Sequence, residues 1–322
     1  MKEPVHVVCA SSAAYIMPLS VMLASLVDNF DPARELRIHI ISSAATARDR
    51  ENIRESIRMN RPGLEHIEIH WYSLDSSLME KLPIREDYHF TRDNYARLFA
   101  PLALPESCER AVYLDCDMVV LADVSLLYDS TAGNDSVVHA THDLGTPRVS
   151  DEQGIFDYVE RGIPPDTRCF NAGTLVINMK RWREQDLTPP MLDYLIRNGD
   201  KVLLADQGAL NAFLHHDWAP LDNRWNQGND ILFPQLWTAA GYSQEEWQVA
   251  KDDPYIIHYT GPKKPWQRGR RAPRYSYFYK YLQKTVYKDS IPHRPYLEDV
   301  VGLRAYYHLW KWARKIPGMV KP

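Results

Sequence analysis

The sequence has little that would indicate a disulfide-linked, membrane-spanning or nucleic-acid-binding protein. Its four cysteines (Cys9, Cys108, Cys116 and Cys169) are scattered without CxxC or other metal-ligand spacing, which predicts reduced thiols. The N-terminus lacks the basic region and cleavage site of a signal peptide, and no apolar run is long enough to span a bilayer. The formal net charge of -4 argues against bulk affinity for nucleic acid. We therefore expect a cytoplasmic protein that does not bind nucleic acid.

What the sequence does contain is a regular alternation of strand-like and helix-like segments. Apolar runs at 6–10, 36–41 and 67–72 predict strands, and the segments 15–30 and 46–59 between them predict helices. Further strands are predicted at 136–140, 174–178 and 255–259, and further helices at 189–198 and 207–214. This order predicts an α/β fold with a mostly parallel central sheet flanked by helices. Such sheets bind ligands beyond the carboxyl ends of their strands.

A shift in composition at Lys263 divides the 322 residues into two parts. We predict one α/β domain over 1–262 and a small, helical, basic and aromatic extension over 263–322 that is available for membrane or acceptor contact. Within it, Arg304–Lys315 mixes aromatic and cationic residues. Two interpretations stay open: an interfacial helix on anionic lipid, or a terminal helix that packs its aromatic side chains on the domain.

Two acidic residues, Asp115 and Asp117, end the apolar run that begins at Arg110. Residues i and i+2 of a strand share a face, so the two carboxylates can point toward one place where the strand opens into a loop. Two such oxygen ligands suit Mg²⁺ or Mn²⁺, and a bound diphosphate could complete the coordination. The run 115–119 also fits the Asp-x-Asp-x-Val pattern of haloacid-dehalogenase phosphatases. Their later acidic pair should follow a strand, whereas the acids of 251–253 precede one.

Five segments in order strengthen the first interpretation: 95–98, 113–117, 170–182, 204–211 and 258–266. Together they resemble glycosyltransferase family 8, which includes glycogenins and bacterial lipopolysaccharide galactosyl- and glucosyltransferases. The resemblance runs from about residue 5 to 267. It implies a GT-A fold and a retaining α-glycosyltransferase that uses Mn²⁺ (or Mg²⁺). The donor would be a UDP-hexose, galactose or glucose, and the acceptor a glycan or a lipid-linked glycan.

The resemblance also implies a location and one further alternative. Basic, aromatic tails attach lipopolysaccharide members of the family to the inner membrane, which implies a peripheral position at its inner face for this chain. A non-catalytic UDP-sugar-binding protein on the same scaffold is the alternative. Loss of a metal ligand would favour that alternative, but Asp115, Asp117 and His258 are all present.

Carried over residue by residue, the resemblance assigns roles to particular side chains. The metal ligands would be Asp115, Asp117 and His258, and the catalytic residues would be Gln207, Asp206 and Lys264. The donor-binding set would be Ala10, Ser11, Ser12, Tyr15, Arg97, Asp115, Cys116, Asp117, Asp143, Asn171, Ala172, Asp206, Gln207, His258, Gly261 and Lys264.

Several of these residues have an ordinary structural alternative. His258 on an apolar strand could be a core histidine, and Lys264 could be a solvated loop lysine. Arg97 could pair with Asp93 four residues earlier, and Asp206 could cap a helix. The functional interpretation of Asp206 is that its carboxylate accepts hydrogen bonds from two sugar hydroxyls and thereby distinguishes sugar epimers.

The nucleotide-binding loop departs from the family pattern. Ser11 and Ser12 stand where the family usually has an acidic residue against the uracil, and Tyr15 matches the aromatic residue that stacks on the base. A serine hydroxyl still bonds to a base, with less charge assistance. Tyr15 could equally be a buried core tyrosine. The choice of uridine therefore depends on the family and not on this loop.

Retention of configuration raises the question of a nucleophile. A double displacement needs one on the far face of the sugar, and the resemblance places Gln207, whose amide is a poor nucleophile, nearest the anomeric carbon. We therefore favour attack by the acceptor on the same face, with the leaving diphosphate taking the proton. Asp143 lies where the family often has an active-site acid, and His142 beside it is interpreted as structural.

Overall fold

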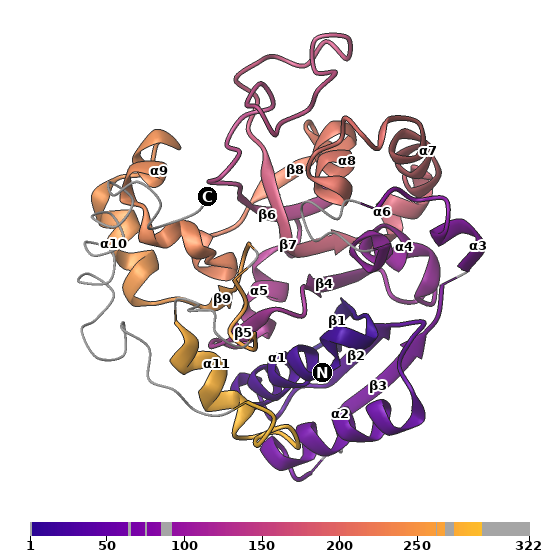
Figure 1. The fold of residues 1–322 in the computed structure, drawn as a ribbon, viewed down its shortest axis with the longest axis vertical. Helices are drawn as coiled ribbons and strands as arrows, with labels where there is room; N and C mark the ends of the chain where they lie inside the picture. Colours follow the sequence, from indigo (N-terminus) through magenta and orange to yellow (C-terminus); the bar gives the residue numbers. More distant parts are fainter. Residues whose placement is uncertain are drawn as a thin grey trace.

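The structure is a computed structural model that describes residues 2–63, 66–74, 76–84, 92–261, 263–267 and 274–291. Its centre is a seven-stranded sheet in the order β3-β2-β1-β4-β7-β6-β8 (Figure 1). The strands are β1 (Val5–Ala10), β2 (Leu36–Ile41), β3 (Ile67–Tyr72), β4 (Arg110–Leu114), β6 (Val138–His142), β7 (Phe170–Asn178) and β8 (Trp218–Pro220). Neighbours among β1 to β4 are parallel, and β7 runs antiparallel to β4 and β6. The predicted mostly parallel sheet is thus confirmed.

Helices cover both faces of this sheet (Figure 1). On one face, α1 (Ile16–Asn29) and α2 (Ala47–Asn60) bury their apolar side chains against β1 and β2. On the other face, α4 (Ala96–Ala103), α7 (Thr188–Asn198) and α8 (Ala205–Leu214) build a second core. The remaining helices are α3 (Ser76–Met79), α5 (Val124–Ser130), α6 (Met179–Glu184), α9 (Pro234–Ala239), α10 (Gln244–Asp252) and α11 (Tyr275–Leu282). Short 3-10 helices are η1 (Ala13–Tyr15), η3 (Arg92–Tyr95), η4 (Asn223–Asn226) and η5 (Asn229–Leu232).

Local sequence explains where several elements begin. Thr46 and Asp49 form a reciprocal capping box at the start of α2, and Ile53 and Ile57 then face the core one turn apart. In β2, Leu36, Ile38 and Ile40 are fully buried on one face and His39 and Ile41 are 2% exposed on the other, so the strand is covered on both faces. Periodicity alone thus locates these elements.

The segment that carries the acid pair differs from the prediction. The run from Arg110 does not continue as one strand, because the chain turns at 115–117 and leaves the central sheet. It then forms β5 (Met118–Val120), which pairs antiparallel with β9 (Ile256–His258) so that Met118 lies opposite His258. Strand alternation therefore does not align the two carboxylates. The turn and the β5–β9 pairing do, and the same pairing brings a histidine beside them.

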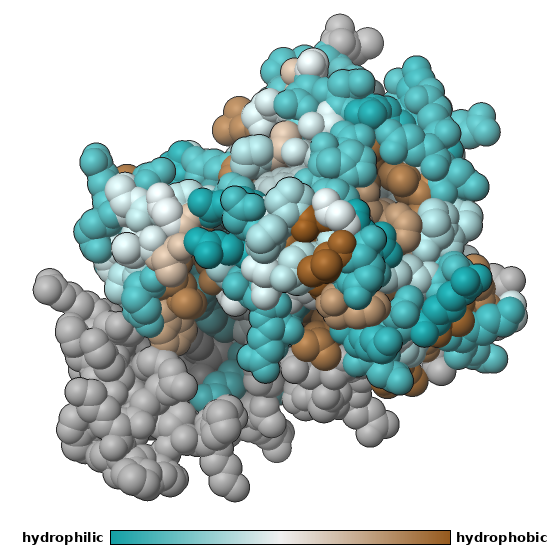
Figure 2. Space-filling model, turned by 90° about the horizontal axis from the view of Figure 1, so that it is seen from above, coloured by the Kyte–Doolittle hydropathy of each residue, from teal (hydrophilic) through white to brown (hydrophobic). Residues whose placement is uncertain are grey.

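The C-terminal extension includes one helix that is part of the core. In α11, Phe278, Tyr281 and Leu282 are buried in a cluster with Val21 and Val119. The segment Arg304–Lys315 lies outside the described residues. Among the helices that the structure describes, none is long and apolar enough to cross a membrane. The face seen in Figure 2 is mostly hydrophilic, with small separate hydrophobic patches.

Candidate functional site

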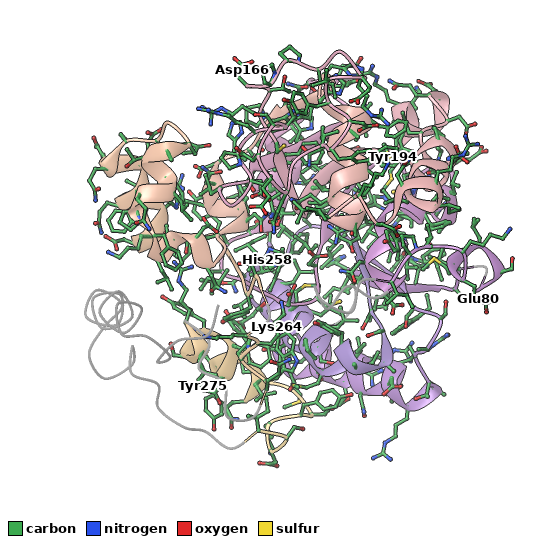
Figure 3. All side chains as sticks on the ribbon, turned by 45° about the horizontal axis from the view of Figure 1, so that its top comes forward. Glu80, Asp166, Tyr194, His258, Lys264 and Tyr275 are labelled. Atoms are coloured by element: carbon green, nitrogen blue, oxygen red, sulfur yellow. The ribbon has the colours of Figure 1, made fainter. Side chains whose placement is uncertain are left out.

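A cavity of about 1200 Å³ opens beyond the carboxyl ends of β1 and β4. Figure 3 places His258 and Lys264, two of its lining residues, near the middle of the molecule. Of the residues predicted to bind the donor, all line this cavity except Ser11. Ser11 is 2% exposed, and its hydroxyl donates to the carbonyl of Ser12. The structure therefore gathers predicted residues from seven separate sequence segments at one place: 10–15, 97, 115–117, 143, 171–172, 206–207 and 258–264.

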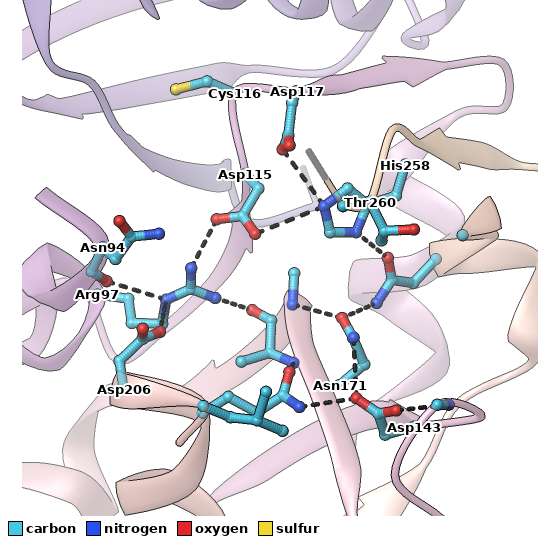
Figure 4. A pocket seen from close by; sticks show the side chains of 18 of the residues that line it. Asn94, Arg97, Asp115, Cys116, Asp117, Asp143, Asn171, Asp206, His258 and Thr260 are labelled. Carbon is cyan, nitrogen blue, oxygen red and sulfur yellow. Dashed lines mark hydrogen bonds and ion pairs between the residues drawn. The ribbon is translucent and has the colours of Figure 1, made fainter. Parts of the chain in front are cut away.

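Asp115, Asp117 and His258 form a compact cluster in the cavity wall (Figure 4). One ligand atom from each lies within 4.8 Å of the others. His258 Nε2 is 3.3 Å from Asp117 Oδ1 and 3.8 Å from Asp115 Oδ2. Two carboxylates and an imidazole are a donor set that suits Mn²⁺ or Mg²⁺, with room on the cavity side for further oxygen ligands. The residues present therefore fit a divalent cation.

Asn226 of η4 holds the histidine in position, and no motif in the sequence marks this residue. Its amide oxygen lies 2.8 Å from His258 Nδ1, and its amide nitrogen donates to Asn171 Oδ1 at 2.7 Å. The Nδ1–H therefore points at the amide, and Nε2 is left to face the two carboxylates. A side chain at Gly173 would place its Cβ 2.5 Å from the His258 ring, so this position of β7 must be glycine.

Replacing Asn226 with leucine should weaken Mn²⁺ binding about 10- to 100-fold, because the imidazole loses the partner that fixes its ring and its tautomer. Isothermal titration with Mn²⁺ measures this directly. Asn198→Leu is the control, since Asn198 also donates one side-chain hydrogen bond, to the carbonyl of Tyr194, but does not line the cavity. Equal Mn²⁺ affinity in Asn226→Leu and the parent protein would contradict this role.

Arg97 of α4 links two acidic residues of the site. Its guanidinium lies 2.7 Å from Asp115 Oδ1 and 2.6 Å from Asp206 Oδ2, and it also donates to the carbonyl of Ala172. Arg97 is 4% exposed, and its guanidinium stacks over the Tyr113 ring at 4.7 Å. Burial opposes its charge, but the two carboxylates outweigh burial and raise the pKa of Arg97. Arg97 is therefore a fixed positive charge inside the site.

The carboxylates respond differently to their surroundings. Burial raises the pKa of Asp206 to about 6, and Arg97 offsets part of this rise. Burial also raises the pKa of Asp115, against the opposing effect of Arg97. For Asp117, burial is outweighed by Lys264 and His258, which hold its pKa well below the usual range. Lys264 Nζ is 2.5 Å from Asp117 Oδ2 and 2.7 Å from the carbonyl of Tyr259.

A network of amides and Asp143 forms the floor of the cavity. Gln207 donates to Asp143 Oδ2 at 2.7 Å, and its own amide oxygen accepts the Ala172 N–H at 3.0 Å. Asn171 donates to the same carboxylate oxygen at 3.2 Å. Asp143 Oδ1 accepts the N–H groups of Gly145 and Thr146, each at 2.8 Å. Gln207 is thus fixed at both ends of its amide, and Asp143 accepts four hydrogen bonds.

Asp206 does not cap α8. The N-cap residue is Leu204, Ala205 adopts a positive φ of 48°, and Asp206 follows in the first turn. The structural alternative for Asp206, a helix N-cap, is therefore wrong, because the N-cap lies two positions earlier. The strained backbone at Ala205 turns Asp206 inward to Arg97.

The end of the cavity near β1 is lined by Ala10, Ser12, Tyr15 and Cys116. Tyr15 is partly exposed to the cavity, and its ring meets that of Trp266 edge to face at 5.5 Å. Gly261 also lines the cavity, with a φ of 78° that favours glycine. Tyr15 is thus not a core tyrosine.

The acidic pair that could imitate a phosphatase motif lies elsewhere. Asp252 and Asp253 end α10 with side chains 61% and 67% exposed, and neither lines the cavity. The geometry therefore removes the basis for the haloacid-dehalogenase alternative.

Comparisons with known proteins agree with this geometry. Residues 6–269 match the profile of the family described as Glycosyl transferase family 8. General stress protein A of Bacillus subtilis (strain 168) is 27% identical over 88% of this chain and 94% of its own length. Lipopolysaccharide 1,2-glucosyltransferase of Escherichia coli (strain K12) is 24% identical over 77% of this chain and 70% of its own length.

Solved structures show the same fold. Galactosyltransferase LgtC, in complex with donor and acceptor sugar analogs, superposes with a TM-score of 0.70 at 22% identity, over 91% of this chain and 98% of its own. The WbbM bifunctional glycosyltransferase superposes with a TM-score of 0.69 at 20% identity, over 90% of this chain and 51% of its own. The fold is thus that of the GT-A glycosyltransferases. The family profile covers most of the chain, and the chain therefore belongs to glycosyl transferase family 8.

Proposed function

We propose that this protein transfers a hexose, galactose or glucose, from a UDP-sugar to a glycan or lipid-linked acceptor, with Mn²⁺ and with retention of configuration. The observation that carries the proposal is one cavity that joins the Asp115–Asp117–His258 cluster to the network of Asp143, Asn171 and Gln207. The activities named for two similar proteins support the proposal. One is a lipopolysaccharide 1,2-glucosyltransferase, and the other is a galactosyltransferase solved with donor and acceptor sugar analogs.

The first part of the proposal concerns the diphosphate. Asp115, Asp117 and His258 would hold a divalent cation, Mn²⁺ or Mg²⁺, which when bound neutralises charge on the departing UDP. Lys264 stands beside Asp117 and brings a second positive charge to the same place. Charges placed in advance where negative charge develops lower the barrier without reorganisation during the reaction.

The second part concerns retention. A covalent intermediate would need a nucleophile, and the acids of the cavity floor are poor candidates. Asp143 accepts four hydrogen bonds, and Asp206 is paired with Arg97. Gln207 has an amide that is fixed at both ends. We therefore infer that the acceptor oxygen bonds to the anomeric carbon on the face from which UDP leaves, while its proton passes to the diphosphate.

The stereochemistry of the product tests this part. Proton NMR of the glycoside formed from an α-linked UDP-hexose should show an α anomeric signal from the first turnovers. A β product would contradict retention and would require an in-line attack by the acceptor.

Replacing Lys264 with methionine should lower the rate of UDP release about 100-fold, because one of the charges that stabilises the leaving diphosphate is lost. Lys263→Met is the matched control, since Lys263 is the adjacent lysine but is exposed and does not line the cavity. Steady-state UDP release from each variant gives the comparison. Lys264→Met with the parent rate, or an equal loss in Lys263→Met, would contradict the assignment.

Membrane contact through the extension over 263–322 is also part of the proposal. Removing residues 292–322 should reduce sedimentation with anionic liposomes severalfold while donor hydrolysis continues. The cut belongs after Ile291, because a cut after Arg274 would remove the buried helix α11. Equal liposome binding by the full and the shortened chain would exclude this contact.

A further inference from the structure

The cavity has a second end at which, of the lining residues, only Asp143 has a role above. We call it the η5–α9 end. It is lined by His142, Asp143, Asn223, Asp230 and Trp237. A small hydrophobic cluster that includes Leu144, Ile231 and Trp237 holds it together. Sequence reasoning found Asp143 and His142 but missed the other three, which lie in an irregular stretch without a motif.

The two ends of the cavity differ in how their acids are paired. At the cluster, Asp115 and Asp206 are paired with Arg97, and Asp117 is paired with Lys264. At the η5–α9 end, the part of the chain that the structure describes supplies no cationic side chain within 4.0 Å of Asp143 or Asp230. Burial and the nearby Asp143 raise the pKa of Asp230 to about 6. Arg274 and His258 offset part of this rise, but within the described residues neither Asp143 nor Asp230 is held in an ion pair as Asp115 and Asp117 are.

The same end also contains buried polar atoms that have no hydrogen-bond partner among the described residues. Trp237 Nε1, Asn223 Oδ1 and His142 Nδ1 are buried, and within the described ranges none of the three atoms has a hydrogen-bond partner. Trp237 is 2% exposed and lines the cavity. An unpaired buried donor or acceptor costs about 1–3 kcal/mol, so such atoms indicate a bound group. One donor, one acceptor and an imidazole nitrogen together match hydroxyl groups, which both donate and accept.

We propose that the η5–α9 end binds an uncharged sugar residue of the acceptor, through Asp230 and Trp237, and rejects an acceptor that carries phosphate or carboxylate on that residue. This inference rests on the proposed function, because it takes the donor to occupy the other end. Asp230 accepts hydrogen bonds from sugar hydroxyls, and the indole N–H donates to a hydroxyl oxygen. An anionic group there would meet two carboxylates, Asp143 and Asp230, neither of which is neutralised by an ion pair within the described residues.

Sugar binding to the full-length protein, loaded with UDP and Mn²⁺, tests the proposal. The probes are methyl β-glucoside and methyl β-galactoside, each compared with the corresponding methyl uronide, which differs only by a carboxylate at C6. Saturation-transfer NMR gives the four affinities. We expect at least one neutral glycoside to bind about tenfold more tightly than its uronide. Asp230→Asn should narrow that ratio to about threefold or less, and Trp237→Phe should weaken the neutral glycoside severalfold.

Asp135→Asn is the control, because it removes the same charge from a side chain that is 86% exposed and does not line the cavity. It should keep the parent ratio. Three results would each overturn the inference. The uronides could bind as tightly as the glycosides, or the neutral glycosides could fail to bind the UDP-loaded protein. In the third case, Asp230→Asn would leave the ratio of glycoside to uronide affinity unchanged. Failure of UDP itself to bind would instead overturn the proposed function, so the two failures are distinguishable.

Discussion

Replacing Asp117 with asparagine should lower sugar transfer about a thousandfold or more, which corresponds to about 4 kcal/mol of lost transition-state stabilisation. Asp117 Oδ1 faces His258 Nε2, and Oδ2 pairs with Lys264, so one substitution weakens the metal cluster and releases the lysine. Asparagine has nearly the same shape, and Asp117 is only 9% exposed, so the surrounding packing should persist. UDP release and Mn²⁺ titration on the same preparation measure both effects.

The control for Asp117→Asn is Asp135→Asn, which changes the net charge equally at an exposed position. A circular dichroism spectrum like that of the parent protein would show that the variant is folded. Turnover at the parent rate in folded Asp117→Asn would refute the assignment of Asp117 as a metal ligand.

Replacing Arg97 with methionine should destabilise the protein by about 3–5 kcal/mol and also abolish transfer. The substitution leaves Asp115 and Asp206 in the protein interior without their cation, and an uncompensated buried charge costs this much. Urea unfolding gives the free energy. Arg224→Met is the control, since Arg224 pairs with Asp222 and Asp253 at the surface and such pairs contribute about 1 kcal/mol or less.

The loss in Arg97→Met should depend on pH in a definite direction. The pKa of Asp206 is about 6 in the folded protein, above the ordinary value of 3.8, so its ionised form is the disfavoured one. Arg97 lowers this pKa, so in Arg97→Met the folded-state pKa of Asp206 should rise above 6, and this part of the loss should be small below pH 6 and grow as pH rises above 6. The double variant Arg97→Met, Asp206→Asn should recover part of the lost stability at pH 8. A loss that is the same at pH 5 and pH 8, with no recovery in the double variant, would contradict the charge argument.

The elements of the fold follow closely from local patterns. Residues 36–41 and 67–72 were predicted as strands within the observed bounds, because alternation and β-branched side chains identify buried strands without long-range information. The β5–β9 pairing was not predictable in this way. It joins residues about 140 positions apart, and the short β5 looks from its sequence like a continuation of β4.

The residues of the site also fall into those that the sequence predicted and those that it did not. Asp115, Asp117 and His258 were found because their neighbours match a family, and not because any local pattern brings them together. Asn226 was missed because a single asparagine in a 3-10 turn has no periodicity, and its partners His258 and Asn171 are 32 and 55 residues away. Asp230 and Trp237 were missed because no motif marks the stretch of chain that contains them.

The measurement that tests the central claim most directly is UDP release from a panel of UDP-sugars, with Mn²⁺ and with chelator, in the presence and absence of a neutral glycoside acceptor. We predict release from UDP-galactose or UDP-glucose that requires Mn²⁺, stops with chelator and increases with the acceptor. Release from either donor that continues undiminished in chelator would contradict the role assigned to the Asp115–Asp117–His258 cluster. Absence of both UDP release and UDP binding across the panel would contradict the proposal that this cavity uses a UDP-sugar.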